Sequence, residues 1–282
     1  MVEVPDDLDL ALTLLRTPAE TSDEDISLHG RFVDASLAHV KPSDAPPAAP
    51  LYHRGLNLAL DDLGNIATIC DRLIWMSDLY VADRLEWGRW WAYAALDVQL
   101  FHIELRSLFD YAAQAIVAAG DTSGQLGDPR RMSFRSLQEK IRRERYRQQL
   151  GTDLADVAVS CTWFPSVREI RDAAVHKGGR IVLFDQPPRI LFQCYENRFQ
   201  AVVGDVATAL MFNRNVVDFT LYAGYLIGRT IAFLERLGEV MLERTEARLI
   251  GSDARSTHPG YRIIRQWIIN AGNALGSVDR ST

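Results

Sequence analysis

Cysteine is scarce in this chain of 282 residues, and the three that occur show no paired spacing. Cys70, Cys161 and Cys194 are scattered and odd in number, which argues against a disulfide framework and against a zinc site. A His-Glu-x-x-His pair, a glycine-rich phosphate loop and a Gly-x-Ser-x-Gly elbow are also absent from the sequence. We therefore expect a protein of a reducing compartment that uses no metal and no cofactor.

Long uninterrupted hydrophobic runs are lacking as well. The best candidates are broken by Asp97, Asp218 and Arg229, so none reaches the length that a membrane span requires. The N-terminal residues 1–7 are acidic and do not have the basic start of a signal peptide. These absences predict a cytoplasmic protein without a membrane segment.

Positive charge is in overall deficit, because 31 basic residues face 37 acidic ones and give a formal net charge of −6. The whole molecule is therefore not expected to bind polyanions in general. Residues 130–147 reverse this balance with Arg130, Arg131, Arg135, Lys140, Arg142, Arg143, Arg145 and Arg147, against Glu139 and Glu144.

This basic stretch has two interpretations. As a functional surface it is a track for an RNA backbone, and the residues expected to bind RNA are Arg131, Arg135, Lys140, Arg142 and Arg143. As a structural element it is a solvated helix whose arginines pair with the acidic N-terminal region. The sequence leaves both open.

The first fifty residues show little periodicity and end in a proline-rich stretch over 41–50. Because proline disrupts helices, we interpret residues 1–50 as an extended arm or linker, with a short helix near Asp7–Leu15. Residues 51–282 are then expected to form a single helical domain.

Apolar residues recur at three- and four-residue steps over long segments of that domain. The pattern predicts helices from about Gly55 to Asp83, Trp90 to Ala119, Val216 to Arg248 and Tyr261 to Ala274. Ser133 is a candidate N-cap for a further helix to about Leu150, and Asp153 for the helix that follows. Two β-branched and aromatic runs around Pro187-Pro188 predict a hairpin over about 180–195. The expected fold is mainly α, an antiparallel helical bundle with a small β-hairpin insertion.

The segment Arg171-Asp172-Ala173-Ala174-Val175-His176 ends the next predicted helix, which restarts or kinks at Pro165 and stops before Gly178. Arginine offers a planar fork of donors to a phosphodiester, and histidine moves protons near neutral pH. Residues five apart on a helix are separated by about 140° around its axis. Arg171 and His176 therefore cannot face one point on a single helix, whereas a two-fold dimer would bring each histidine to the other chain's arginine.

This spacing resembles the Arg-polar-x-x-x-His signature of the HEPN superfamily, which includes ribonuclease toxins and abortive-infection proteins. The resemblance covers residues 88–180 and leaves the hairpin and the C-terminal helices over 200–275 outside the family's core. It implies a homodimer through the motif helix and a metal-independent endoribonuclease or RNA-binding protein. It further implies a toxin–antitoxin or phage-defence role, with an antitoxin or other protein as partner.

The roles implied for the motif are proton transfer by His176, phosphate binding by Arg171 and positioning of the pair by Asp172. The alternative is a non-catalytic helical dimer that serves as a protein-interaction scaffold.

Two further features each have two interpretations. His102, Arg106 and Asp110 form one helical row that either lines the same cleft or is an intrahelical polar ladder. Tryptophans over 75–91 are core or interface anchors more readily than a base-stacking platform.

Overall fold

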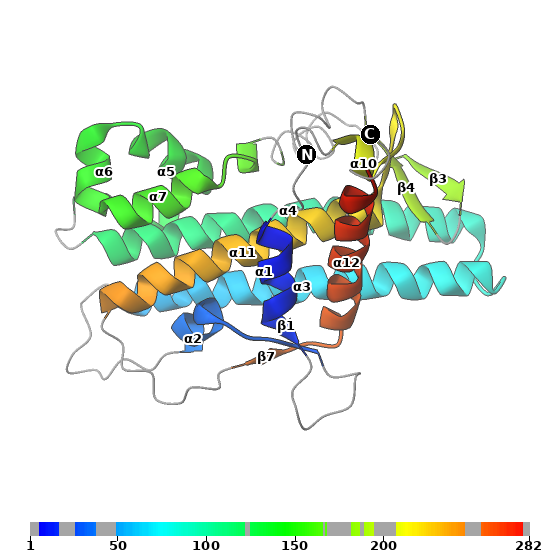
Figure 1. Ribbon diagram of the computed structural model, residues 1–282, viewed down its shortest axis with the longest axis horizontal. Coiled ribbons are helices and arrows are strands. Elements are labelled where there is room, and N and C mark those ends of the chain that lie inside the picture. The colour runs from blue at the N-terminus through cyan, green and yellow to red at the C-terminus, as the bar shows by residue number, and fades with distance from the viewer. Residues whose placement is uncertain are drawn as a thin grey trace.

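The computed structural model describes residues 6–16, 26–37, 49–121, 125–165, 167, 182–186, 189–194, 207–245 and 255–278. Helices dominate these residues, and two small antiparallel sheets complete them. The prediction of a mainly helical fold is thereby confirmed (Figure 1).

Two long antiparallel helices, α3 (Ala49–Val81) and α4 (Trp87–Gly120), form the central pair of the fold. Each has a stripe of apolar residues, and those at the contact, such as Leu63 and Leu105, are fully buried. At Gly55 a side chain is excluded, because a Cβ there would lie 2.9 Å from the carbonyl oxygen of Tyr111. Helix α4 matches its predicted range within three residues. Helix α3 begins at Ala49, six residues before the predicted Gly55, so the extended arm is wrong for residues 49–50; proline is tolerated in the first turn of a helix.

Helices α11 (Phe219–Thr245) and α12 (Tyr261–Val278) pack against each other beside this pair. The prediction for α12 is confirmed within a few residues. The predicted start of α11 at Val216 is wrong, because Val216–Asp218 is a buried strand that joins a sheet. The short β-branched run was indistinguishable from the first turn of a buried helix.

The N-terminal region is folded onto the core. Its elements are α1 (Asp6–Leu14), β1 (Leu15–Arg16), β2 (Ser27–Leu28) and α2 (Arg31–Leu37). Both α1 and α2 pack against α11, and β2 pairs with β7 (Ser256–Thr257) near the other end of the chain. Leu8 and Ala11 of α1, the helix that packs against α11, are buried. The short helix predicted near Asp7–Leu15 is confirmed by α1, whereas an extended arm is wrong for residues 26–37. Residues 1–5, 17–25 and 38–48 of the predicted arm lie outside the described part.

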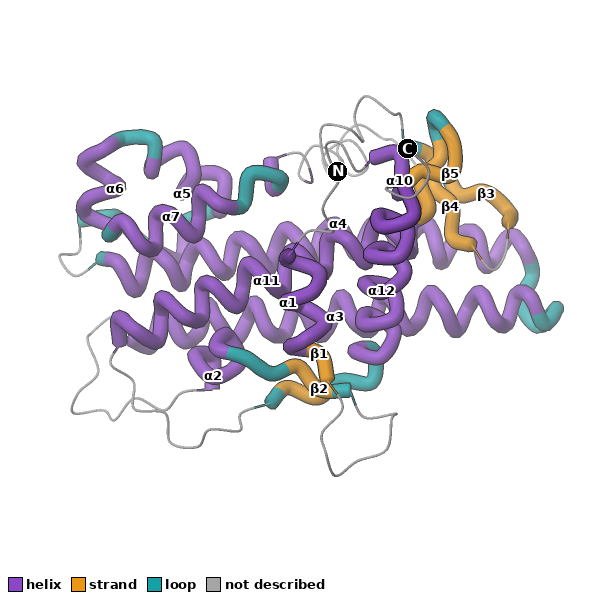
Figure 2. The backbone as a smooth tube through the Cα atoms, viewed as in Figure 1, coloured by secondary structure: helices purple, strands orange, loops and turns teal. Residues whose placement is uncertain are grey.

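A second sheet has the strand order β3-β4-β6-β5. Its strands are β3 (Leu183–Gln186), β4 (Arg189–Gln193), β5 (Met211–Asn213) and β6 (Val216–Asp218), and α10 (Ala207–Leu210) precedes β5. In the register of β3 and β4, Phe184 lies opposite Leu191, which confirms the predicted hairpin. Figure 2 shows this sheet beside α12 and α4.

A lobe of short helices covers one end of α4, as Figure 1 shows. It consists of η1 (Pro129–Arg131), α5 (Phe134–Ile141), α6 (Glu144–Leu150) and α7 (Thr152–Ser160). Ser133 caps α5, its hydroxyl accepting a hydrogen bond from the Ser136 amide at 3.2 Å, as predicted. The single helix expected up to Leu150 is instead two helices that meet at Arg142 and Arg143. Asp153 is not a cap, because its carboxylate pairs with Arg244 of α11.

Candidate nucleic-acid interface

The motif residues Arg171, Asp172 and His176 lie outside the described residues. The segment that leads into them is described as far as Val167. Phe164, Pro165 and Val167 have helical backbone, in line with a helix that restarts near the proline. The structure therefore places residues 161–165 and 167, which lead into the motif, and we call this stretch the entrance to the motif segment.

A buried aromatic cluster anchors this entrance. The rings of Trp163 and Phe164 lie 5.3 Å and 5.0 Å from the ring of Phe109 on α4. Phe164 also meets Phe134 of α5 at 4.8 Å, and Phe134 meets Phe233 of α11 at 5.6 Å. Three helices thus fix the chain immediately before the motif segment.

Hydrogen bonds join the same entrance to the basic helix α5. The side-chain amide of Gln138 donates to the carbonyl oxygens of Ala158 and Cys161, both at 3.0 Å. Cys161 lies two residues before Trp163, so α5 and the start of the motif segment are held in one lobe. The basic residues predicted to bind RNA belong to the part of the fold from which the motif departs.

Several of the basic side chains already have local partners. Arg135 pairs with Glu139 at 2.6 Å, Arg131 lies 3.8 Å from Asp128, and Arg147 pairs with Asp156. The ammonium group of Lys140 lies 5.6 Å from the centre of the Tyr146 ring. None of these described partners comes from the N-terminal region. Most acidic residues of that region lie outside the described residues, so the alternative in which the basic stretch pairs with it stays a prediction.

Four arginines in the lobe are exposed and make no ion pair among the described residues: Arg130, Arg142, Arg143 and Arg145. Arg142 and Arg143 were in the predicted set, and they occupy the junction at which α5 ends and α6 begins. Arg145 was missed because its direction depends on that helix break, which has no glycine or proline to mark it. Free guanidinium groups on one small lobe can each bind a phosphate.

His102 does not line any cleft with this lobe. It is fully buried; its Nδ1 donates to the Val98 carbonyl at 2.7 Å, and its Nε2 therefore accepts from the Tyr222 hydroxyl at 3.0 Å. Burial lowers the pKa of His102 to about 4, so its imidazole is neutral at physiological pH. Within the same helical row only Arg106 and Asp110 pair, at 3.7 Å, and Asp110 also accepts from the Phe134 amide at 2.9 Å. The row therefore has a structural role.

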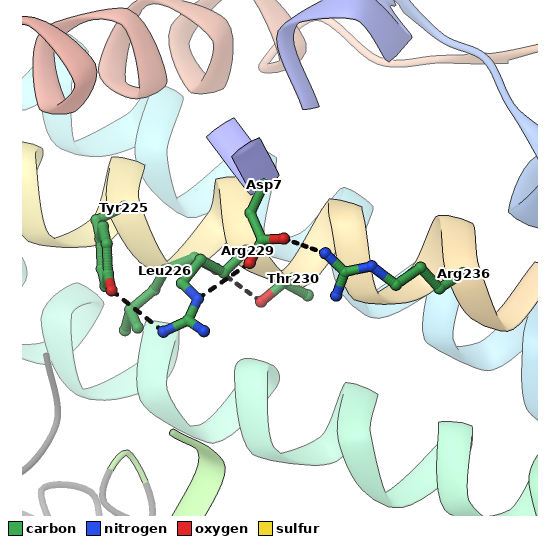
Figure 3. Close-up of polar contacts among 6 residues, drawn as sticks. All are labelled: Asp7, Tyr225, Leu226, Arg229, Thr230 and Arg236. Atoms are coloured by element: carbon green, nitrogen blue, oxygen red, sulfur yellow. Dashed lines mark hydrogen bonds and ion pairs between the residues drawn. The ribbon is translucent and has the colours of Figure 1, made fainter. Parts of the chain in front are cut away.

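A charged group formed by Asp7, Arg229 and Arg236 contacts Trp163, which lies just before the motif segment. In Figure 3 the Asp7 carboxylate of α1 lies between two arginines of α11, Arg229 and Arg236. Arg229 donates to Asp7 at 3.2 Å and to the Tyr225 hydroxyl at 3.1 Å. Its guanidinium group lies 5.3 Å from the centre of the Trp163 ring. Sequence patterns could not indicate this group, because Asp7 and Arg229 are 222 residues apart.

Comparison with known proteins adds no identity. The chain matches no protein-family model, no curated protein and no solved structure. Across the described residues, no cluster of three or more His, Cys, Asp or Glu side chains is arranged to hold a metal. In the same residues, every helix is too short or too polar to cross a lipid bilayer.

Proposed function

We propose that this protein is a HEPN-like, metal-independent endoribonuclease that binds RNA through the basic lobe. The observation that carries the proposal is the set of exposed arginines Arg130, Arg142, Arg143 and Arg145, which make no ion pair within the described part of the chain. They lie in the lobe that also holds the entrance to the motif segment. Because the whole chain has a net charge of −6, a local group of arginines without a described ion-pair partner favours an anionic ligand for this lobe. The motif's resemblance supplies the chemistry, and the lobe supplies the attraction for RNA.

In the proposed reaction an RNA 2′-hydroxyl attacks the adjacent 3′-phosphate. His176 takes the hydroxyl proton as the 2′-oxygen bonds to phosphorus. The bond from phosphorus to the 5′-oxygen breaks, and the leaving 5′-oxygen takes a proton from water, so that a 2′,3′-cyclic phosphate and a 5′-hydroxyl are formed. Arg171 binds the phosphate and stabilises the negative charge of the transition state. Asp172 positions the pair.

The proposal includes a two-fold homodimer through the motif helix, because Arg171 and His176 would then approach each other across the two chains. It places the protein in the cytoplasm, in a toxin–antitoxin or phage-defence system in which an antitoxin or other protein partner restrains it. These extensions follow from the motif's resemblance alone.

The cleavage test uses purified protein and a labelled RNA with paired and unpaired regions, in EDTA. We expect cleavage by the wild type, and a loss of at least about 100-fold in Arg171→Ala and in His176→Ala. His258→Ala is the matched control, because His258 is a half-buried histidine of the loop before α12 whose ring lies 3.1 Å from the Thr68 hydroxyl of α3. Cleavage that survives in His176→Ala would overturn the assignment of the motif.

The binding test separates the lobe from the motif. The triple variant Arg142→Gln, Arg143→Gln, Arg145→Gln removes three of the unpaired cations, and it is compared with Arg84→Gln, Arg214→Gln, Arg262→Gln, which removes three exposed cations elsewhere. If each lobe arginine binds one phosphate of single-stranded RNA, the slope of log K against the logarithm of the salt concentration becomes less steep by about 2 in the lobe triple. The slope of the control triple should not change. Equal losses in the two triples would show that only net charge matters.

One observation favours the second candidate, a non-catalytic scaffold. Large apolar side chains are exposed towards the turn between α3 and α4, among them Trp75 at 59%, Tyr93 at 52% and Leu96 at 51%. Such residues are common at protein interfaces. A folded wild type that neither cleaves nor binds RNA would favour this scaffold.

A further inference from the structure

Two buried aspartates lie at the contact between α3 and α4, and they differ in one respect. Asp97 is 2% exposed and is neutralised by an ion pair with Arg72 of the facing helix. Asp62 is 8% exposed, and its Oδ2 atom makes no hydrogen bond with any described residue. A buried carboxylate oxygen without a partner is costly, since it has lost its water and gained nothing in return.

The surroundings of Asp62 are rich in oxygen. Glu104 of α4 interacts with Asp62 across the helix contact, and the Ser107 hydroxyl, one turn further along α4, hydrogen bonds to the same carboxyl group. Asn65 lies one turn beyond Asp62 on α3, and its side-chain amide donates to Glu104 Oε2 at 3.1 Å. The four side chains form two i, i+3 pairs on facing helices, an arrangement that helical bundles use for metal sites.

The charge of this group is uncompensated. Burial is the largest cause that raises the pKa of Asp62, and the negative charges of Glu104 and Asp61 and the hydrogen bond with Glu104 act in the same direction. The hydrogen bond from Ser107 opposes them, and the pKa that results is about 7. Among the described residues, no arginine, lysine or histidine contributes to stabilising the Asp62 carboxylate. The position that Arg72 fills for Asp97 has no equivalent here.

We propose that Asp62, Glu104, Asn65 and Ser107 bind one hard divalent cation, Ca²⁺ or Mg²⁺, between α3 and α4. Two carboxylates, an amide oxygen and a hydroxyl are oxygen ligands of the kind that both ions prefer. Rotation of the Asn65 amide turns its carbonyl oxygen towards the carboxylates, and the exposed position of Asn65 admits the water molecules that complete the shell. The cation occupies the place of the missing arginine and has a structural role, separate from the proposed RNA chemistry.

The first test compares thermal unfolding at pH 7.5 in EDTA with unfolding in 5 mM CaCl₂ or MgCl₂. We expect the wild-type Tm to rise by about 3 °C or more in at least one of the two salts. Asp62→Asn keeps the shape and removes the charge, so its Tm should not respond. Asp78→Asn is the matched control, because Asp78 is an exposed carboxylate of the same helix, and it should respond as the wild type does.

Calorimetric titration of the wild type with CaCl₂ and MgCl₂ adds a direct measure of binding. One site per chain is expected, with affinity reduced at least tenfold in Glu104→Gln, a variant that removes the charge of the second carboxylate of the site. The proposal is overturned if the wild type shows no response to either ion. It is also overturned if Asp62→Asn responds equally, which would indicate an adventitious ion only. Neither result depends on whether the protein cleaves RNA.

Discussion

Asp62→Asn should make the protein more stable at pH 8, although it removes a side chain at the centre of the fold. The pKa of Asp62 is about 7 in the folded protein and 3.8 in the reference state, a difference of about three units. Each unit corresponds to about 1.4 kcal/mol of free energy of unfolding, so full ionisation costs the fold at most about 4 kcal/mol. Local relaxation and sharing of the proton with Glu104 reduce this figure, and we expect a gain of about 2–4 kcal/mol.

The sign of the effect fixes its pH window. Below pH 3.8 the carboxyl is protonated in both states and contributes nothing to the pH dependence. As the pH rises from there to about 7, the unfolded chain ionises while the folded protein holds its proton, so stability is lost. Above that range the loss is complete and constant. The advantage of Asp62→Asn should therefore be small at pH 4.5 and largest at pH 8.

Urea unfolding in EDTA, followed by far-UV circular dichroism at pH 4.5, 6 and 8, measures this difference directly. Asp97→Asn is the informative contrast, because it leaves Arg72 without its buried partner and should destabilise the protein by about 1–3 kcal/mol. If Asp62→Asn is no more stable than the wild type at pH 8, the claim that Asp62 is an uncompensated buried charge is refuted.

Two further outcomes are expected. Asp7→Ala should lower the free energy of unfolding in urea by about 1–3 kcal/mol, because it leaves Arg229 and Arg236 without their shared carboxylate. Asp9→Ala, which changes an exposed residue of the same helix, should lower it by less than about 0.5 kcal/mol. Equal effects would mean that the ion pairs of Asp7 contribute nothing. The imidazole signal of His102 in NMR should remain that of a neutral ring down to pH 5.5, because burial lowers its pKa to about 4. Since that pKa is lowered, stability is lost as the pH falls from 6.5 towards 4, and a His102 midpoint near 6.5 would contradict the buried geometry.

The parts of the fold that the sequence predicted well are those with a long, regular signal. In α3, α4 and α12 the apolar stripe repeats over many turns, so a few ambiguous residues cannot hide the helix. The β3–β4 hairpin was predicted because its strands are β-branched and aromatic and flank a proline turn. In each case the information is local.

The parts that were predicted incorrectly depend on distant partners. Helices α1 and α2 are short and weakly periodic, and both are buried against α11, which is about 200 residues away in the sequence. His102 has the same sequence context as a surface histidine, and only Tyr222 and the surrounding core make it a buried, neutral one. For the candidate interface, composition identified the basic stretch, but the break at Arg142 and Arg143 decides which arginines remain free.

The docking of α1 on α11 has a consequence for the order in which the chain becomes folded. During translation α1 leaves the ribosome long before Arg229 and Arg236 exist, a delay of about 10–40 s at about 5–20 residues per second. Until then the apolar face that includes Leu8 and Ala11 has no permanent binding surface. Helix α1 is therefore made long before it can dock, and a nascent chain arrested before α11 would expose the apolar face of α1 to chaperones and proteases.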